Sequence, residues 1–366
     1  NFGKILLDDN LKKEDNMIFT GLLFGFLFGF LLKRSRFCPT GTIRDIYLEK
    51  RYYNLVLLLA IIFTNALIYH ILRYFDFVPM TYFAEFPVIG IALGSFVFGF
   101  GAIMCNGCLT STLIKSGDGR VIGLISLVTF TITSYIAVKG PLKPISKYFE
   151  SGKLTLPDEF LDKLPLSPII LCAIIVLVLY FLMFRHYKSH KLKFKLPSRY
   201  TGLRHVFCEK MWSKELTVVL IGLLMGFAFY FSSLTGRIGS FGISTPILTW
   251  ADKICPIETA GIGWGVDGQG LGWGSMFVLG IILGSFFTSL ISKEFSIILP
   301  NKKTVVYTII GSALMAVGAI WGQGCIISNG FVFTAQLSMK GWFAFVFLMI
   351  GIWTAARIFL VTKQRS

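Results

Sequence analysis

Long runs without a charged side chain dominate this sequence and restrict what it can fold into. Crossing about 30 Å of hydrocarbon takes about 20 helical residues, and most of the runs are long enough. Only 15% of the residues are charged, against roughly 25% in soluble domains. The sequence therefore predicts an all-α polytopic membrane protein with about nine transmembrane helices. The nine runs are 17–32, 54–72, 89–114, 121–138, 168–184, 216–235, 275–292, 304–339 and 341–356.

The basic residues gather between these runs. The net charge is +16, and the segments 33–51 and 185–214 hold many of the lysines and arginines. With nine crossings both segments fall on one side of the membrane, which the positive-inside rule makes the cytoplasmic side. We therefore expect the N-terminus outside and the C-terminus inside, and no nucleic-acid partner. The loop 139–165, expected outside, fits less well because it carries five lysines beside four acidic residues.

The sequence also carries an internal repeat. Residues 21–41 and 222–242 share the pattern Gly-Leu-Leu-x-Gly-Phe-x-Phe-x-Phe. Residues 101–111 and 318–328 share Gly-Ala-Ile, then Gly-Cys, then Ser. Agreement at this density in two blocks indicates that the two halves of the chain have related structures.

This repeat sets the expected domain organisation. Each half contributes four crossings, so one span between them inverts the second half, an arrangement typical of transporters. We expect a polar N-terminal extension at 1–16, a first transmembrane repeat at 17–138 and a second at 216–366. The connecting region, 139–215, holds an external loop, the linking span 168–184 and a basic cytoplasmic loop.

One uncharged run is too long to be a single spanning helix. The 36 residues of 304–339 would extend about 54 Å at about 1.5 Å per residue. We expect a break at Gly322-Gln323-Gly324, and at Asn106-Gly107 in the other repeat, because glycine tolerates unusual backbone angles. Short helices then begin at Leu109 and Ile326, and their free N–H groups favour an anion at a central constriction.

The cysteines beside the breaks suggest several kinds of chemistry. A redox pair of Cys105 and Cys108 needs both sulfurs, but the second repeat has Gly322 in place of Cys105 and keeps only Cys325. A metal site needs three or four ligands, and only His70 among the histidines lies in a span, so we expect neither metal nor cofactor. A neutral thiol is a weak, polarisable donor that can contact a soft anion without trapping it. We expect Cys172, Cys208 and Cys255 to act as small packing residues.

At these residues the sequence resembles the YeeE/YedE family of membrane proteins, whose characterised members take up thiosulfate. The resemblance covers nearly the whole chain from Met17. It rests on Cys-Pro-Thr-Gly at 38–41, Gly-Ala-x4-Gly-Cys at 101–108 and the Gly-Cys ending at Cys325. It implies nine spans, an hourglass shape and three cysteines along the substrate path. By motif these are Cys38, Cys108 and Cys325.

Further polar residues near these motifs are candidates for the substrate path. Arg36 and Arg237 match across the repeat and can attract anions at the two mouths, although each can equally bind lipid phosphate or a helix end. Donation to oxyanion oxygens or hydrogen bonding between helices fits each polar candidate equally well. Those polar candidates are Asn106, Gln323, Ser111 and Ser328, and Cys105 is an additional thiol beside them.

Two loops have weaker signals. The glycine-rich stretch 261–274 reads as an interfacial loop with tryptophan anchors, or as an outer vestibule. The basic loop 185–214 faces anionic lipid, or docks a cytoplasmic sulfur-carrier (TusA-like) or rhodanese-like protein.

Together these observations predict a transport protein of the bacterial inner membrane, not an enzyme. We expect it to take up thiosulfate or a close sulfur oxyanion by relay along thiols, with Cys108 and Cys325 near the constriction and Cys38 toward the cytoplasm. The alternatives are a transporter of another sulfur or selenium compound, a membrane thiol- or persulfide-transfer protein, and a structural subunit.

Overall fold

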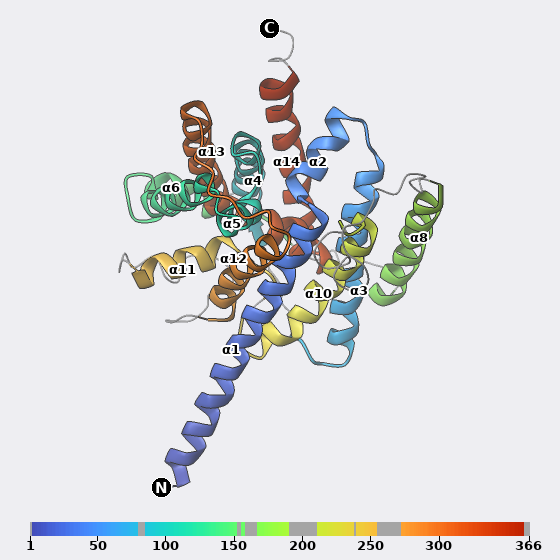
Figure 1. The fold of residues 1–366 in the computed structure, drawn as a ribbon. Helices are drawn as coiled ribbons and strands as arrows, with labels where there is room; N and C mark the ends of the chain where they lie inside the picture. Colours follow the sequence, from blue (N-terminus) through green and yellow to red (C-terminus); the bar gives the residue numbers. More distant parts are fainter. Residues whose placement is uncertain are drawn as a thin grey trace.

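The computed structural model is almost entirely helical (Figure 1). It describes residues 2–79, 85–151, 155–157, 167–189, 211–237, 239–254 and 272–361, and the side chains of these residues except 2–17 and 155–157. A two-stranded antiparallel pairing of β1 (Glu85–Pro87) with β2 (Thr155–Pro157) joins two connecting segments.

The helices of the two halves follow one another in the same order. The first half contains α1 (Phe2–Ser35), α2 (Pro39–Leu48), α3 (Tyr53–Tyr74), α4 (Val88–Met104), α5 (Leu109–Gly117) and α6 (Val121–Val138). Helices α7 (Lys143–Glu150) and α8 (Pro168–Ser189) connect the halves. The second half contains α10 (Lys214–Ser233), α11 (Ser244–Ile254), α12 (Trp273–Ile291), α13 (Lys302–Trp321), the π-helix η2 (Ser328–Phe333), α14 (Met339–Ala356) and η3 (Arg357–Val361).

Among the described residues, nine segments are long and apolar enough to cross a membrane. The first, Ile18–Leu48, joins α1 to α2, and the third, Val88–Gly117, joins α4 to α5. Each of the nine uncharged runs supplies one of these segments, which confirms the all-α polytopic fold. The ends of the domains expected from the repeat stay a prediction.

Helices α1 and α12 pack closely because glycines let their backbones approach. Gly21 faces Trp273, and Gly29, two helical turns later, faces Ile281, so the two helices run in parallel. A Cβ atom on Gly21, Gly25 or Gly29 would overlap a carbonyl oxygen of α12. Small residues spaced four apart are a common means of packing helices in membranes, where close backbone contact replaces the hydrophobic effect.

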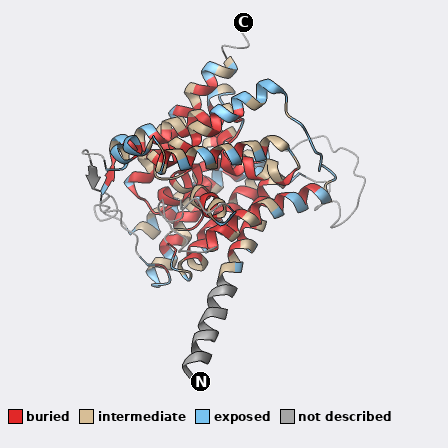
Figure 2. Ribbon diagram, turned by 90° about the vertical axis from the view of Figure 1, so that its left-hand side faces the viewer, coloured by how far each residue is buried: buried red, intermediate tan, exposed pale blue. Residues whose placement is uncertain are grey.

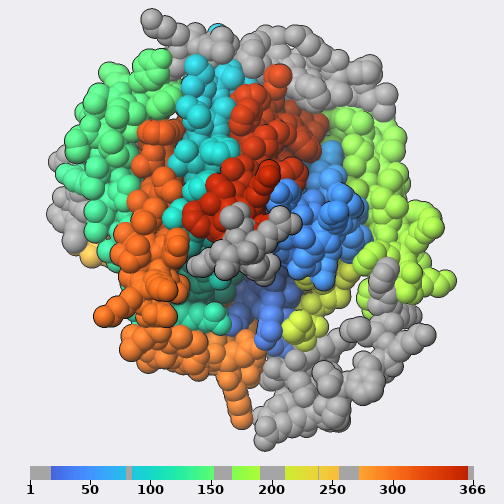
Figure 3. Space-filling model, turned by 90° about the horizontal axis from the view of Figure 1, so that it is seen from above, coloured from blue at the N-terminus to red at the C-terminus, as the bar shows by residue number. Residues whose placement is uncertain are grey.

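Contacts between the halves follow one scheme twice. Helix α1 packs on α12, and its repeat-mate α10 packs on α3. Helix α4 packs on α14, and its repeat-mate α13 packs on α6, while α4 and α13 contact each other at the centre. Figure 3 shows α13 (orange), α4 (cyan) and α14 (red) side by side on one face. This pairing is what two related halves would produce, and their inverted relation stays a prediction.

Buried residues fill the centre of the molecule, and exposed ones lie toward its periphery (Figure 2). Helix α8 instead lies at the edge of the molecule, coloured yellow-green in Figure 3, and contacts α3. Its side chains Leu177 and Phe181 are 70% and 65% exposed. An apolar helix with so much exposed surface suits contact with lipid, which agrees with a single span that links the halves.

Candidate functional site

Both halves contain a break of nearly identical backbone shape. Helix α4 ends at Met104 and α5 begins at Leu109, while α13 ends at Trp321. Asn106 and Gln323 both adopt left-handed φ angles, 54° and 51°. The next residues, Gly107 and Gly324, have φ angles of 141° and 155°, which residues other than glycine rarely adopt. The glycines therefore create the breaks at the positions that the sequence predicts.

At the first break a lysine donates hydrogen bonds to carbonyl oxygens that the interrupted helix leaves free. Lys115 donates from Nζ to the carbonyl oxygens of Cys105, at 3.2 Å, and Asn106, at 2.9 Å. Cys108 is the N-cap residue of α5, and its side chain makes no capping hydrogen bond. The acceptors of the break are thus taken up, whereas the first N–H groups of α5 carry the partial positive charge of a helix N-terminus.

At the second break an amide performs the same task. Asn329 donates from Nδ2 to the carbonyl oxygens of Gly322, at 2.9 Å, and Gly324, at 3.4 Å. The thiol of Cys325 lies 3.6 Å from the hydroxyl of Ser328. The chain continues into the π-helix η2, a wide turn of the kind often found at functional sites.

A pocket of about 590 Å³, the Cys38 pocket, lies beside the first break. The Sγ atom of Cys38 is 3.0 Å from Ser111 Oγ and accepts a hydrogen bond from the Gly41 N–H at 3.4 Å. Cys38 holds this position because it is the N-cap of α2 and Pro39 starts the helix. The lining residues are Leu32, Lys33, Arg36, Phe37, Cys38, Asn106, Ser111, Ile114, Lys115, Asp118, Arg120 and Glu294.

Charged residues surround the mouth of the Cys38 pocket, with four basic side chains against two acidic ones. Lys33 pairs with Asp118 at 2.7 Å and with Glu294 at 3.2 Å, and Arg36 pairs with Glu294 at 3.0 Å. Partial burial raises the pKa of Glu294, but Lys33 and Arg36 lower it by more, so its net pKa falls below the usual value. The pocket therefore keeps an excess of positive charge that suits an anion.

A second pocket of about 390 Å³, the Arg237 pocket, lies beside the second break. It gathers Arg237, Gln323 and Ser328, together with the hydroxyl side chains of Ser134, Ser240, Ser244 and Thr245. A Cβ atom on Gly242 would come within 2.5 Å of Arg237 Nη2 and 3.8 Å of Ser328 Oγ. The missing side chain at Gly242 thus makes room for the guanidinium close to Ser328.

Glu150, at the end of α7, is the one acidic residue among the described side chains that line the Arg237 pocket. Partial burial raises its pKa above the usual value of a glutamate, because desolvation disfavours the charged carboxylate. The buried side chain of Arg237 lines the same pocket and carries the opposite charge. Basic and hydroxyl groups outnumber acidic ones here as well, so both pockets have the chemistry of an anion site.

The two pockets lie toward opposite ends of α13. Gln323 of the Arg237 pocket follows the end of this helix, and Glu294 of the Cys38 pocket belongs to the segment that precedes its start. Because the loop after α12 is tied to the end of α5 through a Ser296 N–H bond to the Asp118 carbonyl, Glu294 and the Cys38 pocket share one side of the protein.

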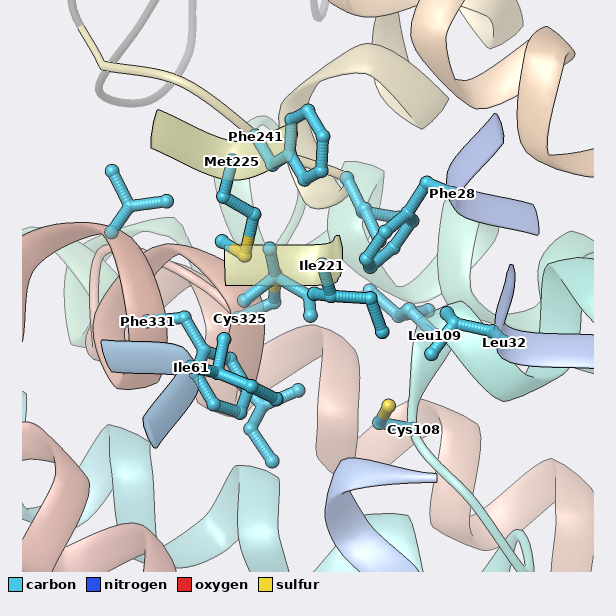
Figure 4. Packing of buried hydrophobic residues seen from close by; sticks show 14 of the residues in the cluster. Phe28, Leu32, Ile61, Cys108, Leu109, Ile221, Met225, Phe241, Cys325 and Phe331 are labelled. Carbon is cyan, nitrogen blue, oxygen red and sulfur yellow. The ribbon is translucent and has the colours of Figure 1, made fainter. Parts of the chain in front are cut away.

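Cys108 and Cys325 both belong to the large buried core cluster of the protein. Their exposed fractions are 0% and 1%, so neither faces lipid. Figure 4 shows both among the same buried apolar side chains, with Ile221 and Phe331 near Cys325. A small cavity of about 10 Å³, which holds no more than about one water, lies against the Cys38 pocket. Its lining residues are Phe28, Leu32, Phe37, Pro39, Ile61, Ile221, Met225, Ile327 and Phe331.

Cys105 makes its side-chain hydrogen bonds to helix α13. Its Sγ donates to the Thr308 carbonyl oxygen at 3.3 Å and lies 3.3 Å from Ser312 Oγ, which is 2.5 Å from Ser126 Oγ. These contacts join α4, α13 and α6 and leave Cys105 outside both pockets. A packing role fits this position.

The remaining sequence candidates divide between packing and segments that are not described. Cys172 is buried in a small cluster with Ala66, Ala335 and Leu337. Cys208, Cys255, most of the loop 185–214 and most of the stretch 261–274 lie outside the described residues. Within the described part of the chain, no three His, Cys, Asp or Glu side chains are grouped to hold a metal ion.

Sequence reasoning missed most of the charged residues at the site, Lys33, Asp118, Arg120 and Glu294 of the Cys38 pocket among them. Three others lie at the breaks or line the Arg237 pocket. Lys115 binds the first break, Lys340 donates to Gln323 Oε1 at 2.9 Å, and Glu150 lines the Arg237 pocket. A signal for the lysines was present, because Lys115 and Lys340 are the first charged residues after each Gly-Cys. Glu150 had no such signal, since only folding brings α7 to the pocket.

Comparisons with known proteins give one matching family model and several relatives. The family model described as Sulphur transport matches residues 34–354. A protein of Escherichia coli named thiosulfate transporter TsuA is 33% identical over 96% of this chain and 97% of its own length. A protein of the same name from Spirochaeta thermophila is 26% identical over 93% of this chain and 99% of its own. The probable transporter YedE of Salmonella typhimurium is 29% identical over 31% of this chain and 29% of its own.

Proposed function

The chain belongs to the Sulphur transport family, and from this premise we propose that it carries thiosulfate, or a close sulfur oxyanion, inward across the bacterial inner membrane. Two relatives that match it along almost their whole length are named thiosulfate transporters. In the described part of the chain, nine candidate spans and two pockets that hold arginine and hydroxyl groups, toward opposite ends of α13, supply what a membrane passage for an anion needs.

The single observation that carries this proposal is a hydroxyl–thiol contact at each of the two pockets. Ser328 lines the Arg237 pocket and touches Cys325 at 3.6 Å. Ser111 lines the Cys38 pocket and touches Cys38 at 3.0 Å. Cys108 is the N-cap residue of α5, the helix that carries Ser111, and belongs to the same buried cluster as Cys325.

The proposed path starts at the Arg237 pocket. The anion binds there, passes Cys325 and Cys108 in the constriction, and leaves through the Cys38 pocket. A thiol suits this passage because it donates weakly to a soft, sulfur-bearing anion, and a site must release its ligand as well as admit it. Each contact is a hydrogen bond, and the relay forms no covalent bond. Opening the constriction requires the side chains around the small cavity to move.

The decisive test is growth of a sulfur-auxotrophic bacterium on thiosulfate as its sole sulfur source. We expect the native chain to support growth and Cys38→Ala, Cys108→Ala and Cys325→Ala each to abolish it at equal protein abundance. Cys172→Ala is the matched control, since Cys172 is as buried as Cys108 and Cys325 but lies outside the proposed path. Growth with all three path variants would contradict the proposal.

Two further readouts separate the alternatives. A thiol- or persulfide-transfer protein predicts that Cys105→Ser is as damaging as Cys108→Ser and that a mixed disulfide or persulfide can be trapped. The transport proposal predicts a milder effect at Cys105, because its thiol bonds to α13. Competition of uptake by selenite, sulfite or sulfate identifies a different substrate.

A further inference from the structure

Lys340, at the start of α14, is a fully buried lysine beside the Arg237 pocket. Its Nζ donates to Gln323 Oε1 at 2.9 Å and lies 4.8 Å from the centre of the Phe333 ring. Both Gln323 and Phe333 line the Arg237 pocket. Burying an ammonium is costly unless polar or aromatic partners compensate, so the placement of Lys340 against these two residues calls for a role.

The hydrogen-bonding chemistry of lysine dictates the orientation of Gln323. An ammonium has three donors and no acceptor, whereas a carboxamide has an acceptor at one end and donors at the other. Lys340 therefore holds the oxygen of Gln323, and the NH₂ group must point elsewhere. Within the described part of the chain, that NH₂ group has no hydrogen-bond partner, and Gln323 forms part of the pocket wall.

We propose that Lys340 is a positioning residue that fixes Gln323 as a hydrogen-bond donor to the oxyanion in the Arg237 pocket. This inference rests on the proposed function and assigns the specificity of the same site. With its oxygen held by Lys340, Gln323 presents only donors to the pocket, beside the guanidinium of Arg237. A fully deprotonated oxyanion, which only accepts hydrogen bonds, matches that wall.

Other side chains at the two breaks also donate to hydrogen-bond acceptors. Asn329 ties up the carbonyl oxygens of Gly322 and Gly324, which would otherwise repel an anion. Lys115 does so for Cys105 and Asn106 in the first break. Side-chain donors thus occupy exposed acceptors at both breaks, and Lys340 extends this arrangement from the backbone to a side-chain oxygen.

The sharpest test replaces Gln323 by glutamate. Gln323→Glu keeps an oxygen for Lys340, so the buried ammonium stays paired, but it removes the donor and brings an acceptor to the anion. We expect the KM for uptake of labelled thiosulfate to rise at least about tenfold, the size of one lost hydrogen bond to a charged group. Protein abundance and melting temperature should match those of the native chain.

Changes at Lys340 test the positioning role directly. Lys340→Met frees the carboxamide to rotate, and we expect a higher KM with a maximal rate per molecule close to native. Lys340→Arg should restore much of the affinity, because a guanidinium also only donates. Lys303→Met is the matched control, since Lys303 is exposed at the start of α13 and far from the break along the chain.

The outcomes separate this inference from the proposed function. If the native chain fails to take up thiosulfate, the proposed function falls and the inference falls with it. If the native chain transports and Gln323→Glu leaves KM unchanged, only the inference is overturned. Loss of the folded protein in Gln323→Glu would also overturn it, because the bond from Lys340 should survive that change.

Discussion

At the scale of residues, the shape of the site depends on glycines, which have no side chain. Gly242 leaves space that the Arg237 guanidinium occupies, close to Ser328. Glycine is also required at Gly107 and Gly324, where the backbone angles favour glycine and the helices are interrupted. Small residues therefore shape the site as much as the polar residues that line it.

Gly242→Ala should disable the Arg237 pocket without unfolding the protein. The added methyl group would lie within 2.5 Å of Arg237 Nη2, and the flexible arginine can move away at little cost to the fold. We expect thiosulfate uptake to fall about tenfold or more through a higher KM, as for a lost charge-assisted hydrogen bond. Uptake kinetics in cells with measured protein abundance check this expectation.

The matched control is Gly41→Ala in the first half. A Cβ atom there meets Cys38 only at ordinary contact distances, 3.5 Å to its Cβ and 3.7 Å to its Sγ. We expect a smaller effect on uptake than at Gly242. Equal KM values for Gly242→Ala and the native chain would show that the guanidinium position is unimportant.

At the scale of elements, the contact between α1 and α12 supports the fold around the site. Three glycines of α1 lie against the α12 backbone, and the end of α1 leads directly to Arg36 and Cys38. A shift of α1 along α12 would therefore move one wall of the Cys38 pocket. The glycine stripe is a structural requirement that also positions functional residues.

Gly25→Ala should destabilise the protein. Its new Cβ atom would overlap the carbonyl oxygen of Phe277 and come within 3.0 Å of Gly280 Cα, and backbone atoms cannot move aside cheaply. Overpacking of this kind costs about 1–3 kcal/mol. We expect a clearly lower melting temperature in detergent, measured by thermal unfolding. Leu23→Ala, on the exposed face of the same helix, is the control and should leave it nearly unchanged.

At the scale of the whole molecule, the two halves pack across each other. Helix α1 pairs with α12 and α10 with α3, so the first helix of each half packs on a helix of the other. This exchange places one break beside each pocket, toward the two ends of α13. The pockets are then expected to open on opposite sides of the membrane.

Labelling of introduced cysteines tests this orientation. Ser151→Cys lies next to Glu150 of the Arg237 pocket, and Lys293→Cys lies next to Glu294 of the Cys38 pocket; both positions are exposed. We expect a membrane-impermeant maleimide to label Ser151→Cys in intact cells and Lys293→Cys only after permeabilisation, above the background of the unmodified chain. Labelling of both from outside would refute the expected topology.

Much of the fold follows from local properties of the sequence. Hydropathy alone predicted the nine spans, because a helix that crosses lipid must be apolar along its whole length. Chain length and glycine predicted the breaks, since 36 uncharged residues cannot form one spanning helix. The repeat then drew attention to Cys108 and Cys325, which the structure places in one buried cluster.

The site itself depends on contacts between residues far apart in the chain. Nothing near Cys105 in the sequence shows that its thiol faces Thr308 and Ser312, and nothing near Glu150 shows that α7 reaches the Arg237 pocket. Periodicity and motifs report the environment along one helix. They do not report which face of another helix lies opposite.

The sequence by itself therefore determined that this chain is a polytopic helical protein with two broken, related halves. Tertiary structure decided that Lys340 donates to Gln323 and that Arg237 shares a pocket with Gln323 and Ser328. The physical reason is that transfer into lipid and backbone freedom act residue by residue. Hydrogen bonds between side chains, by contrast, exist only after packing has brought their helices together.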